Sequence, residues 1–237
     1  YVHEVRPDGS LGETREWDGA QGALRPLAGP TARFGASMVF DSLRGVIVLF
    51  GGKGGPGVRF SETWEYNGVS WVQRSLPGPS ARYNFAMAYD AARHVTVLFG
   101  GIGLQAPEFG DTWEYDGTSW TQRLVSGPSV REAIGCTYDP VRHVTVLFGG
   151  SYSDGTDVHW YNDTWEWDGS AWTNRDVSGP SVRWGNSLVF DTSRGVTLLF
   201  GGAGVPYGTN FYNDTWDWDG LQWSQRLTSG PSVRAAH

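Results

Sequence analysis

The nine residues RHVTVLFGG occur at residues 93–101 and again, letter for letter, at 142–150. Two near-copies, RGVIVLFGG and RGVTLLFGG, lie at 44–52 and 194–202. Four copies at nearly constant spacing indicate a chain built from repeated units, in which each unit buries its apolar face against a neighbour. The repeat therefore decides how every other motif is interpreted.

Two further motifs follow the same period. A Gly-Pro segment that ends in arginine begins at residues 29, 78, 127, 179 and 230, with steps of 49, 49, 52 and 51 residues. An acidic-aromatic segment such as DTWEYDG begins at residues 62, 111, 163 and 214, and each copy is followed by another tryptophan, Trp71, Trp120, Trp172 or Trp223. The full units span about residues 29–77, 78–126, 127–178 and 179–229.

Each unit is predicted to contain four short strands. The first follows the arginine, as in RWGNSLVFD at 183–191, and the second is the VTVLFGG segment. The third is DTWEYDG at 111–117, and the fourth is SWTQR at 119–123. Gly, Pro, Asp and Asn cluster between these segments, which is the turn chemistry of an antiparallel meander. A period near 50 residues with four strands per unit predicts the blades of a β-propeller.

The double glycine, followed by an aromatic strand and then a tryptophan, resembles the kelch repeat. The resemblance covers four full units, about residues 29–229. It implies an all-β, kelch-type β-propeller of four-stranded blades, as a single domain over residues 1–237. It implies little about function, because kelch propellers carry many unrelated activities. The resemblance favours an extracellular or periplasmic location, but the sequence itself leaves the compartment unknown.

The two ends of the chain are predicted to share a fifth blade. ETREWDG at 13–19 matches the third strand, with Arg15 in place of tryptophan, and YVHEVR at 1–6 serves as the second strand. GPSVRAAH at 230–237 supplies a first strand, so that residues 1–28 and 230–237 complete one blade and close the ring. Kelch propellers more commonly have six or seven blades, so the alternative is that this chain is part of a longer propeller.

Composition argues against several kinds of partner. A net charge of −7 argues against nucleic acid, and no apolar run approaches the roughly 18 residues of a membrane span. The single cysteine, Cys136, cannot form an internal disulfide and fits a small buried residue. The chain begins at Tyr1, as expected if a signal peptide or another domain precedes it. No cofactor is predicted, and the chain is expected to be a monomer.

The connections between strands divide over two faces. One face carries tight turns of nearly constant sequence, which need only a structural role. The other carries the variable loops 53–62, 102–111, 151–163 and 203–214. Aromatics that recur in these loops are expected to pack, namely Phe60, Phe109, Tyr161 and Tyr212. Side chains that do not recur are the better ligand candidates, namely Tyr152, His159, Trp160, Tyr207 and Phe211. The alternative is that these loops are solvated and their aromatics incidental.

The arginines of the Gly-Pro segments lie on this loop-rich face and are expected to ring the mouth of the central channel, namely Arg33, Arg82, Arg131, Arg183 and Arg234. Guanidiniums around one axis repel each other and suit a carboxylate, sulfate or phosphate. One hypothesis is therefore that the mouth holds an anion, and that Arg131→Ala and Arg183→Ala weaken acidic-ligand binding. The alternative is that each guanidinium braces loop carbonyls or a carboxylate. Glu132 is the one acid that directly follows these arginines, and Trp184 holds the equivalent place in the last full unit.

Three functions remain open from sequence alone. The favoured one is a non-catalytic scaffold that presents the loop-rich face, with its arginines, Glu132, Trp184 and the variable aromatics, to a protein or glycan ligand that can be anionic. The second is an enzyme that acts on an acidic sugar with Glu132 as acid or base, as a resemblance to kelch-type sialic acid mutarotases implies. The third is a repeat scaffold without a small-molecule site. The burial and pKa of Glu132 would separate the first two.

Motifs of two other kelch-fold enzyme classes are missing. Cys136 has no histidine pair of the kind used by copper radical oxidases, and the E-x3-D-x3-H run of the iron-dependent specifier proteins does not occur. Asp154, Asp157 and His159 gather in one loop without an ordered ligand spacing. The sequence therefore predicts no metal site.

Overall fold

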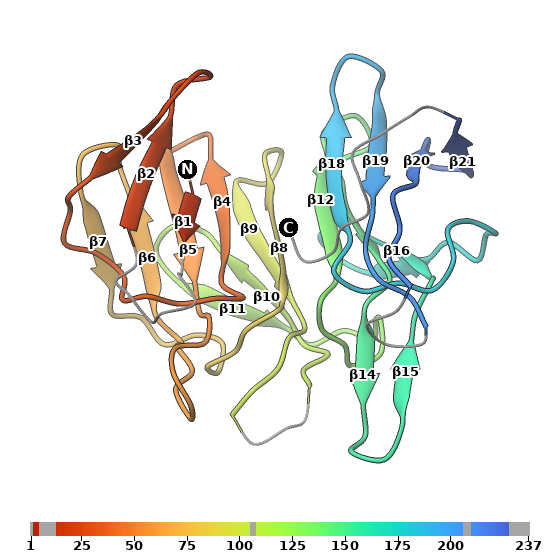
Figure 1. Ribbon diagram of the computed structural model, residues 1–237, viewed down its shortest axis with the longest axis horizontal. Coiled ribbons are helices and arrows are strands. Elements are labelled where there is room, and N and C mark those ends of the chain that lie inside the picture. The colour runs from red at the N-terminus through yellow and green to blue at the C-terminus, as the bar shows by residue number, and fades with distance from the viewer. Residues whose placement is uncertain (1, 5–12, 105–107, 206–209, 228–237) are drawn as a thin grey trace.

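The computed structural model describes residues 2–4, 13–104, 108–205 and 210–227, and these residues form an all-β fold (Figure 1). Four sheets, here called blades 1 to 4, have four antiparallel strands each. A three-stranded N-terminal sheet and a two-stranded hairpin complete the described strands. No helix long and apolar enough to cross a membrane occurs in the described part of the chain. Repeated four-stranded sheets confirm the predicted architecture of a β-propeller.

The blades follow one another along the chain. Blade 1 contains β4 (Ser37–Asp41), β5 (Val46–Phe50), β6 (Thr63–Tyr66) and β7 (Trp71–Arg74). Blade 2 contains β8 (Ala86–Asp90), β9 (Val95–Phe99), β10 (Thr112–Tyr115) and β11 (Trp120–Arg123). Blade 3 contains β12 (Gly135–Asp139), β13 (Val144–Phe148), β16 (Thr164–Trp167) and β17 (Trp172–Asn174). Blade 4 contains β18 (Ser187–Asp191), β19 (Val196–Phe200), β20 (Thr215–Trp218) and β21 (Trp223–Arg226).

The first strand of each blade lies innermost. Contacts between blades run from β4 to β8, from β8 to β12 and from β12 to β18. The second strands of blades 1 to 3 are almost fully buried, since both of their faces are covered by neighbouring sheets, whereas β19 of blade 4 is only partly buried. The hairpin of β14 (Ser151–Ser153) and β15 (Val158–Trp160) projects from blade 3 in the loop between its second and third strands (Figure 1).

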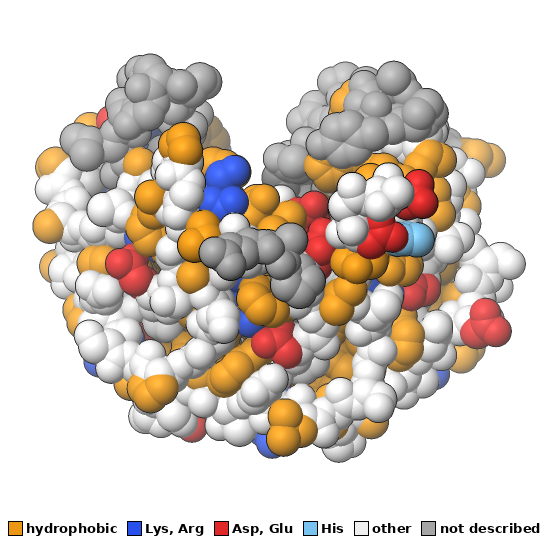
Figure 2. Space-filling model, turned by 90° about the horizontal axis from the view of Figure 1, so that it is seen from below, with side chains coloured by type: hydrophobic (Ala, Val, Ile, Leu, Met, Phe, Trp, Pro, Cys, Tyr) orange, Lys and Arg blue, Asp and Glu red, His pale blue; other side chains and the backbone are white. Residues whose placement is uncertain are grey.

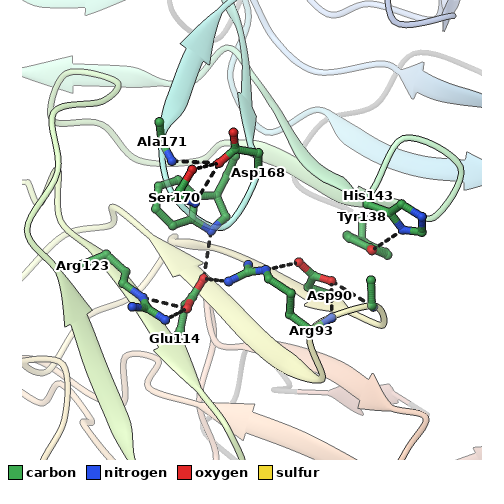
Figure 3. A network of polar contacts seen from close by, with 11 residues as sticks. Asp90, Arg93, Glu114, Arg123, Tyr138, His143, Asp168, Ser170 and Ala171 are labelled. Carbon is green, nitrogen blue, oxygen red and sulfur yellow. Dashed lines mark hydrogen bonds and ion pairs between the residues drawn. The ribbon is translucent and has the colours of Figure 1, made fainter.

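A buried carboxylate on the third strand of blades 1 to 3 joins each of these blades to the next, as Glu114 shows (Figure 3). Glu114 accepts hydrogen bonds from Arg93 (2.5 Å) and Arg123 (2.7 Å) of its own blade, and from the Trp167 indole of the next blade (2.9 Å). Arg93 also pairs with Asp90 at 2.8 Å. Burying a charge is tolerated only when its lone pairs are satisfied, and here both carboxylate oxygens are occupied.

The same bond recurs at the other interfaces, from Tyr66 to Glu16, from Tyr115 to Glu65 and from Trp218 to Glu166. Burial by itself would raise the pKa of Glu65. Hydrogen bonds from Arg44 and Arg74 outweigh this and lower the pKa, so the carboxylate stays ionised. Each interface between blades 1 and 4 therefore contains a buried carboxylate that accepts one of its hydrogen bonds from the next blade.

The N-terminal sheet packs on blade 1 as one more blade would. It contains β1 (Val2–Glu4), β2 (Glu13–Trp17) and β3 (Gly22–Arg25). The Trp71 indole donates to Thr14 at 2.8 Å and Tyr66 donates to Glu16 at 2.8 Å. Indoles in blades 2 to 4 make the same bond to a threonine of the preceding blade, with Trp120 on Thr63, Trp172 on Thr112 and Trp223 on Thr164. Strand β2 thus occupies the place of a third strand, as ETREWDG predicts.

The double glycine permits close contact between blades. Gly100 and Gly101 have φ of +75° and +96°, in the left-handed region that other residues adopt only at a cost. A Cβ on Gly100 would lie 2.6 Å from the Arg131 carbonyl oxygen of the next blade. The glycines are therefore needed both for the left-handed backbone turn and for the close approach of the backbone of the next blade.

We expect Gly100→Ala to destabilise the protein far more than Gly155→Ala. Both positions have a left-handed φ, +75° and +90°, but a Cβ on Gly155 meets no atom within 4 Å. Left-handed backbone costs an alanine about 1–2 kcal/mol. The collision at Gly100 adds a further ~1–3 kcal/mol. Urea unfolding measures both changes, and equal losses of unfolding free energy would show that the approach of blade 3 does not require glycine.

Candidate functional site

The arginines of the Gly-Pro segments are buried ion-pair partners. Arg82 is 0% exposed, and it bonds Asp111 at 2.6 Å and the Gly100 carbonyl at 3.0 Å. The same arrangement joins Arg33 to Glu62, Arg131 to Asp163 and Arg183 to Asp214. This pairing explains why the Gly-Pro and acidic-aromatic motifs keep the same period, because each supplies one half of the pair.

The recurring aromatics pack on these guanidiniums, as predicted. The ring centroids of Phe60, Phe109, Tyr161 and Tyr212 lie 3.9 to 4.1 Å from the arginine Cζ atoms. An arginine with a carboxylate, carbonyls and a ring around it has little left for a ligand. This corrects the expectation of a free arginine ring, for Arg33, Arg82, Arg131 and Arg183. Their observed role is the alternative one, in which they brace the loops, and Arg234 lies outside the described residues.

Two residues after each of these four arginines, the backbone forms a belt of hydrogen bonds around the channel. The Asn84 N–H donates to the Gly35 carbonyl, Ala133 donates to Asn84, and Gly185 donates to Ala133, each at 2.8 Å. All four residues have left-handed φ, between +51° and +64°. The first strand of blade 4 accordingly begins at Ser187 rather than at Arg183 as predicted, because the left-handed residue breaks the extended run.

The residue before each belt position belongs to a small sheet that joins the connections on the loop-rich face. Phe34 pairs with Lys53, which pairs with Arg59. The equivalent sets are Tyr83–Ile102–Glu108, Glu132–Ser151–Trp160 and Trp184–Ala203–Phe211. We call the side chains of these twelve residues the rim. Paired residues on neighbouring strands point to the same face, so each set presents its side chains together. Figure 2 views this face and shows basic, acidic and hydrophobic side chains around its centre.

One side of the rim is acidic. The Asn84 amide donates to Glu132 Oε2 at 2.8 Å, across the interface of blades 2 and 3. Glu108 is only 6% exposed, and while Oε1 accepts from the Ser153 N–H at 3.1 Å, Oε2 has no partner among the described residues. Burial raises the pKa of Glu132, the Asn84 bond opposes this, and the charge of Glu108 adds to the rise. Glu132 is therefore easier to protonate than an ordinary glutamate.

The other side of the rim is basic and aromatic. Lys53 Nζ lies 5.2 Å from the Phe34 ring centroid and 5.3 Å from that of Tyr83. The Arg59 guanidinium lies 4.5 Å from the Tyr83 centroid, and the Phe34 and Tyr83 rings meet edge to face at 6.1 Å. Burial and the charge of Glu132 raise the pKa of Tyr83, although Arg59 opposes this. Tyr83 thus connects the basic and acidic sides.

The predicted loop aromatics divide into two groups. Trp160 and Phe211 belong to the rim, where Trp160 lies 6.4 Å from Trp184 between ring centroids. Tyr152 and His159 instead stack on each other across the hairpin, with their ring centroids 5.7 Å apart. They are the pair next to Ser151 and Trp160, so their side chains lie on the opposite face of the hairpin from the rim. Tyr207 lies outside the described residues. No cluster of metal-ligating side chains occurs in the described part of the chain, and His159 contacts Asp154 alone of its loop acids, at 3.4 Å.

Three charged residues of the rim, Lys53, Arg59 and Glu108, and the belt residue Asn84 beside it were not predicted from the sequence. A signal for them exists in the repeat. Arg59 and Glu108 occupy the same column as Trp160 and Phe211, directly before the recurring aromatic. Reading each column of the aligned units for the residue that departs from the others would have found all of them.

The opposite mouth of the channel is apolar. Its cavity, of about 390 Å³, is lined mainly by the innermost strands, with Met87, Tyr89, Tyr138 and Phe190 among the lining residues. Cys136 also lines it, and burial raises the pKa of this thiol to about 12, so it remains protonated. Cys136 is therefore only half-buried, not fully buried as predicted, although its thiol remains protonated.

We expect Glu132→Gln to stabilise the protein at pH 7. Since the folded-state pKa is raised, the stability that this group contributes is complete below the ordinary glutamate pKa of about 4.3 and is lost as the pH rises through the raised value. The urea midpoint of the variant should exceed that of the natural protein at pH 7 and match it at pH 3. Glu62→Gln is the control with opposite sign, because Trp64 and Arg33 outweigh burial and lower the pKa of Glu62. A Glu132→Gln variant that is less stable at pH 7 would contradict the assignment.

Comparison with known proteins supports the fold. No family model and no curated protein matches the chain. Among solved structures, it is similar to the structure of YjhT, with 12% sequence identity, 91% of each chain covered and a TM-score of 0.51. At this identity the likeness concerns the fold alone, which is an all-β architecture of repeated antiparallel sheets.

Proposed function

We propose that the protein is a non-catalytic binding module whose rim holds a glycan or protein ligand. The observation that carries the proposal is the belt, which brings the residues that differ most between repeats to one mouth of the channel. Recurring side chains are used in buried pairs, whereas Tyr83, Glu132 and Trp184 carry different chemistry at equivalent places. Variable side chains on a rigid scaffold are the usual basis of specific binding.

A glycan fits the rim better than an extended apolar segment. Sugar rings have apolar C–H faces that pack on aromatic rings, and the rim supplies Tyr83, Trp160 and Trp184. Their hydroxyl groups need hydrogen-bond partners, and Glu132 with Asn84 supplies a carboxylate and an amide side by side. Left-handed φ at Asn84 and Ala133, where glycine would be less strained, also marks the belt as a place under functional constraint.

We expect Trp184→Ala to weaken ligand binding by at least about fivefold, because truncating a central aromatic at an interface commonly costs more than about 1 kcal/mol. The ligand is first identified by screening the purified protein against glycans and candidate protein partners, and its affinity is then measured by calorimetry. Phe40→Ala is the control, since Phe40 is 58% exposed and lines the opposite mouth. Loss of binding in the Phe40 variant together with full binding in the Trp184 variant would place the ligand at the opposite mouth and contradict the proposal.

A second candidate is an enzyme that acts on an acidic sugar, with Glu132 as acid or base. The raised pKa of Glu132 favours it, because a general acid needs a proton available near the working pH. The variant Glu132→Gln distinguishes catalysis from binding. It would abolish turnover by an enzyme that uses Glu132 as acid or base, but its side chain still accepts a hydrogen bond and would still bind a ligand. A ligand that dissociates chemically unchanged from the natural protein supports the binding module.

We further propose that the kelch-type ring closes with five blades. The bonds that Thr14 and Glu16 accept support this, because they make the N-terminal sheet equivalent to the last three strands of a blade. Trp17, at the place of Tyr66 in blade 1, is 62% exposed, which leaves the outer face of β2 available for blade 4. Gly22 stands where Trp71 stands in blade 1, so the closing interface has to use different contacts.

Removing residues 230–237 should lower the melting temperature clearly, because the shared blade would lose its first strand. A variant with these eight residues replaced by glycine and serine keeps the length and should melt like the truncated chain. Unchanged melting in both variants would show that the ring does not close through this segment.

A further inference from the structure

Lys53 and Arg59 are cations without a carboxylate partner among the residues that the structure describes. Of the arginines in the described residues, all except Arg59 form an ion pair with an aspartate or glutamate. Lys53 is the one lysine of the chain, and no ion pair to it occurs in the described part either. Both unpaired cations come from the same loop of blade 1 and lie at the rim.

The backbone holds these two charges close together. Lys53 and Arg59 are cross-strand partners, and both lie over the Tyr83 ring, with Nζ at 5.3 Å and Cζ at 4.5 Å from its centroid. Like charges directly opposite each other on paired strands are destabilising. Within the described residues the Arg59 Nε is buried without a hydrogen-bond partner, while its Nη1 donates to the Val58 carbonyl at 3.0 Å and the guanidinium also interacts with the Tyr83 side chain. Repulsion and an unmet donor are both relieved by a bound anion.

We infer that Lys53 and Arg59 form an oxyanion subsite, with Tyr83 and Phe34 as its aromatic wall. A carboxylate, sulfate or phosphate group on the ligand would accept hydrogen bonds from both cations. The buried arginines of the Gly-Pro segments take no part, because each already has its own carboxylate. The inference rests on the proposed function, since the subsite belongs to the same rim.

Charge at the rim also fixes the orientation of the ligand. Glu108 and Glu132 repel an oxyanion on their side, and with Asn84 they favour hydroxyl or ammonium donors. The anionic end of the ligand therefore lies toward blade 1, and its donor groups lie toward blade 3. The ligand class is a polyhydroxylated or amino-bearing molecule with an oxyanion at one end.

Sulfate serves as the test probe because it needs no prior identification of the ligand. Thermal unfolding is followed in sodium sulfate and in sodium chloride at equal ionic strength, for the natural protein and for Lys53→Gln/Arg59→Gln. Above the dissociation constant, each tenfold increase in sulfate should raise the folding equilibrium constant of the natural protein about tenfold beyond that of the variant. General stabilisation by sulfate acts on both proteins and cancels in this comparison.

Arg25→Gln/Arg226→Gln is the matched control, because it changes the net charge equally at two partly exposed arginines outside the rim. This control should respond to sulfate like the natural protein. In chloride at low ionic strength, Lys53→Gln/Arg59→Gln should be at least as stable as the natural protein, since the repulsion is gone. Equal sulfate responses in all three proteins would overturn the subsite, and so would a loss confined to the control.

Two sugars distinguish the kind of anion. Glucuronate and glucose differ in a carboxylate, so stabilisation by glucuronate alone, lost in Lys53→Gln/Arg59→Gln, assigns the subsite to carboxylates. A sulfate effect without a glucuronate effect supports the subsite and assigns it to sulfate or phosphate groups. Failure of the sulfate test leaves the proposed binding function intact, because that function is tested separately by Trp184→Ala.

Discussion

The buried carboxylate at the centre of each blade interface is the interaction on which the rest of the structure depends. Glu114 accepts hydrogen bonds from two arginines of its own blade and from a tryptophan indole of the next blade. All of its hydrogen-bond partners are therefore present only when the two blades are packed together. Removing one partner of such a group leaves an uncompensated charge, which is far more costly than never burying the pair. Blades are therefore bound to one another by a polar requirement as well as by apolar packing.

A second set of polar contacts, the buried arginine–carboxylate pairs, lies near the loop-rich face and fixes the loops there. Arg82, Asp111 and the Phe109 ring fix the connections, and the double glycine lets the next blade approach. Because the recurring arginines are used in this way, they are not available to a ligand. The proposed recognition therefore rests on the side chains that vary between repeats, which can change without loss of the scaffold.

The rim shows the result of this division. It places two carboxylates, two cations and several aromatic rings at one mouth of the channel, beside the Asn84 amide of the belt, while the other mouth is apolar. Lys53 and Arg59 are conspicuous because nearly every other described basic group is neutralised. In the binding function that we propose, this polarity across the rim, from blade 1 to blade 3, would distinguish the two ends of a ligand.

Much of the fold was predictable from sequence, because the signals are local. The double glycine, the Asp-Gly turns and the apolar second strands repeat within each unit, and they predict four-stranded blades with nearly correct bounds. The first strands were predicted to begin too early, since a left-handed residue such as Asn84 or Ala133 is not evident from the letters alone. Of the four belt residues, only Gly35 and Gly185 are of the residue type that commonly adopts this left-handed conformation.

The repeat by itself determined which residues are equivalent, and hence the all-β class, the unit length and the column in which Glu132 and Trp184 stand. Only the tertiary structure decided which equivalents meet. Arg82 and Asp111 are 29 residues apart, and Asn84 and Glu132 are 48 apart across a blade interface. Such contacts depend on the packing of blades around the axis, and no local periodicity encodes that packing. For this reason the sequence identified the arginines as a group, but the structure was needed to show that those in its described part are buried and that Lys53 and Arg59 form no ion pair there.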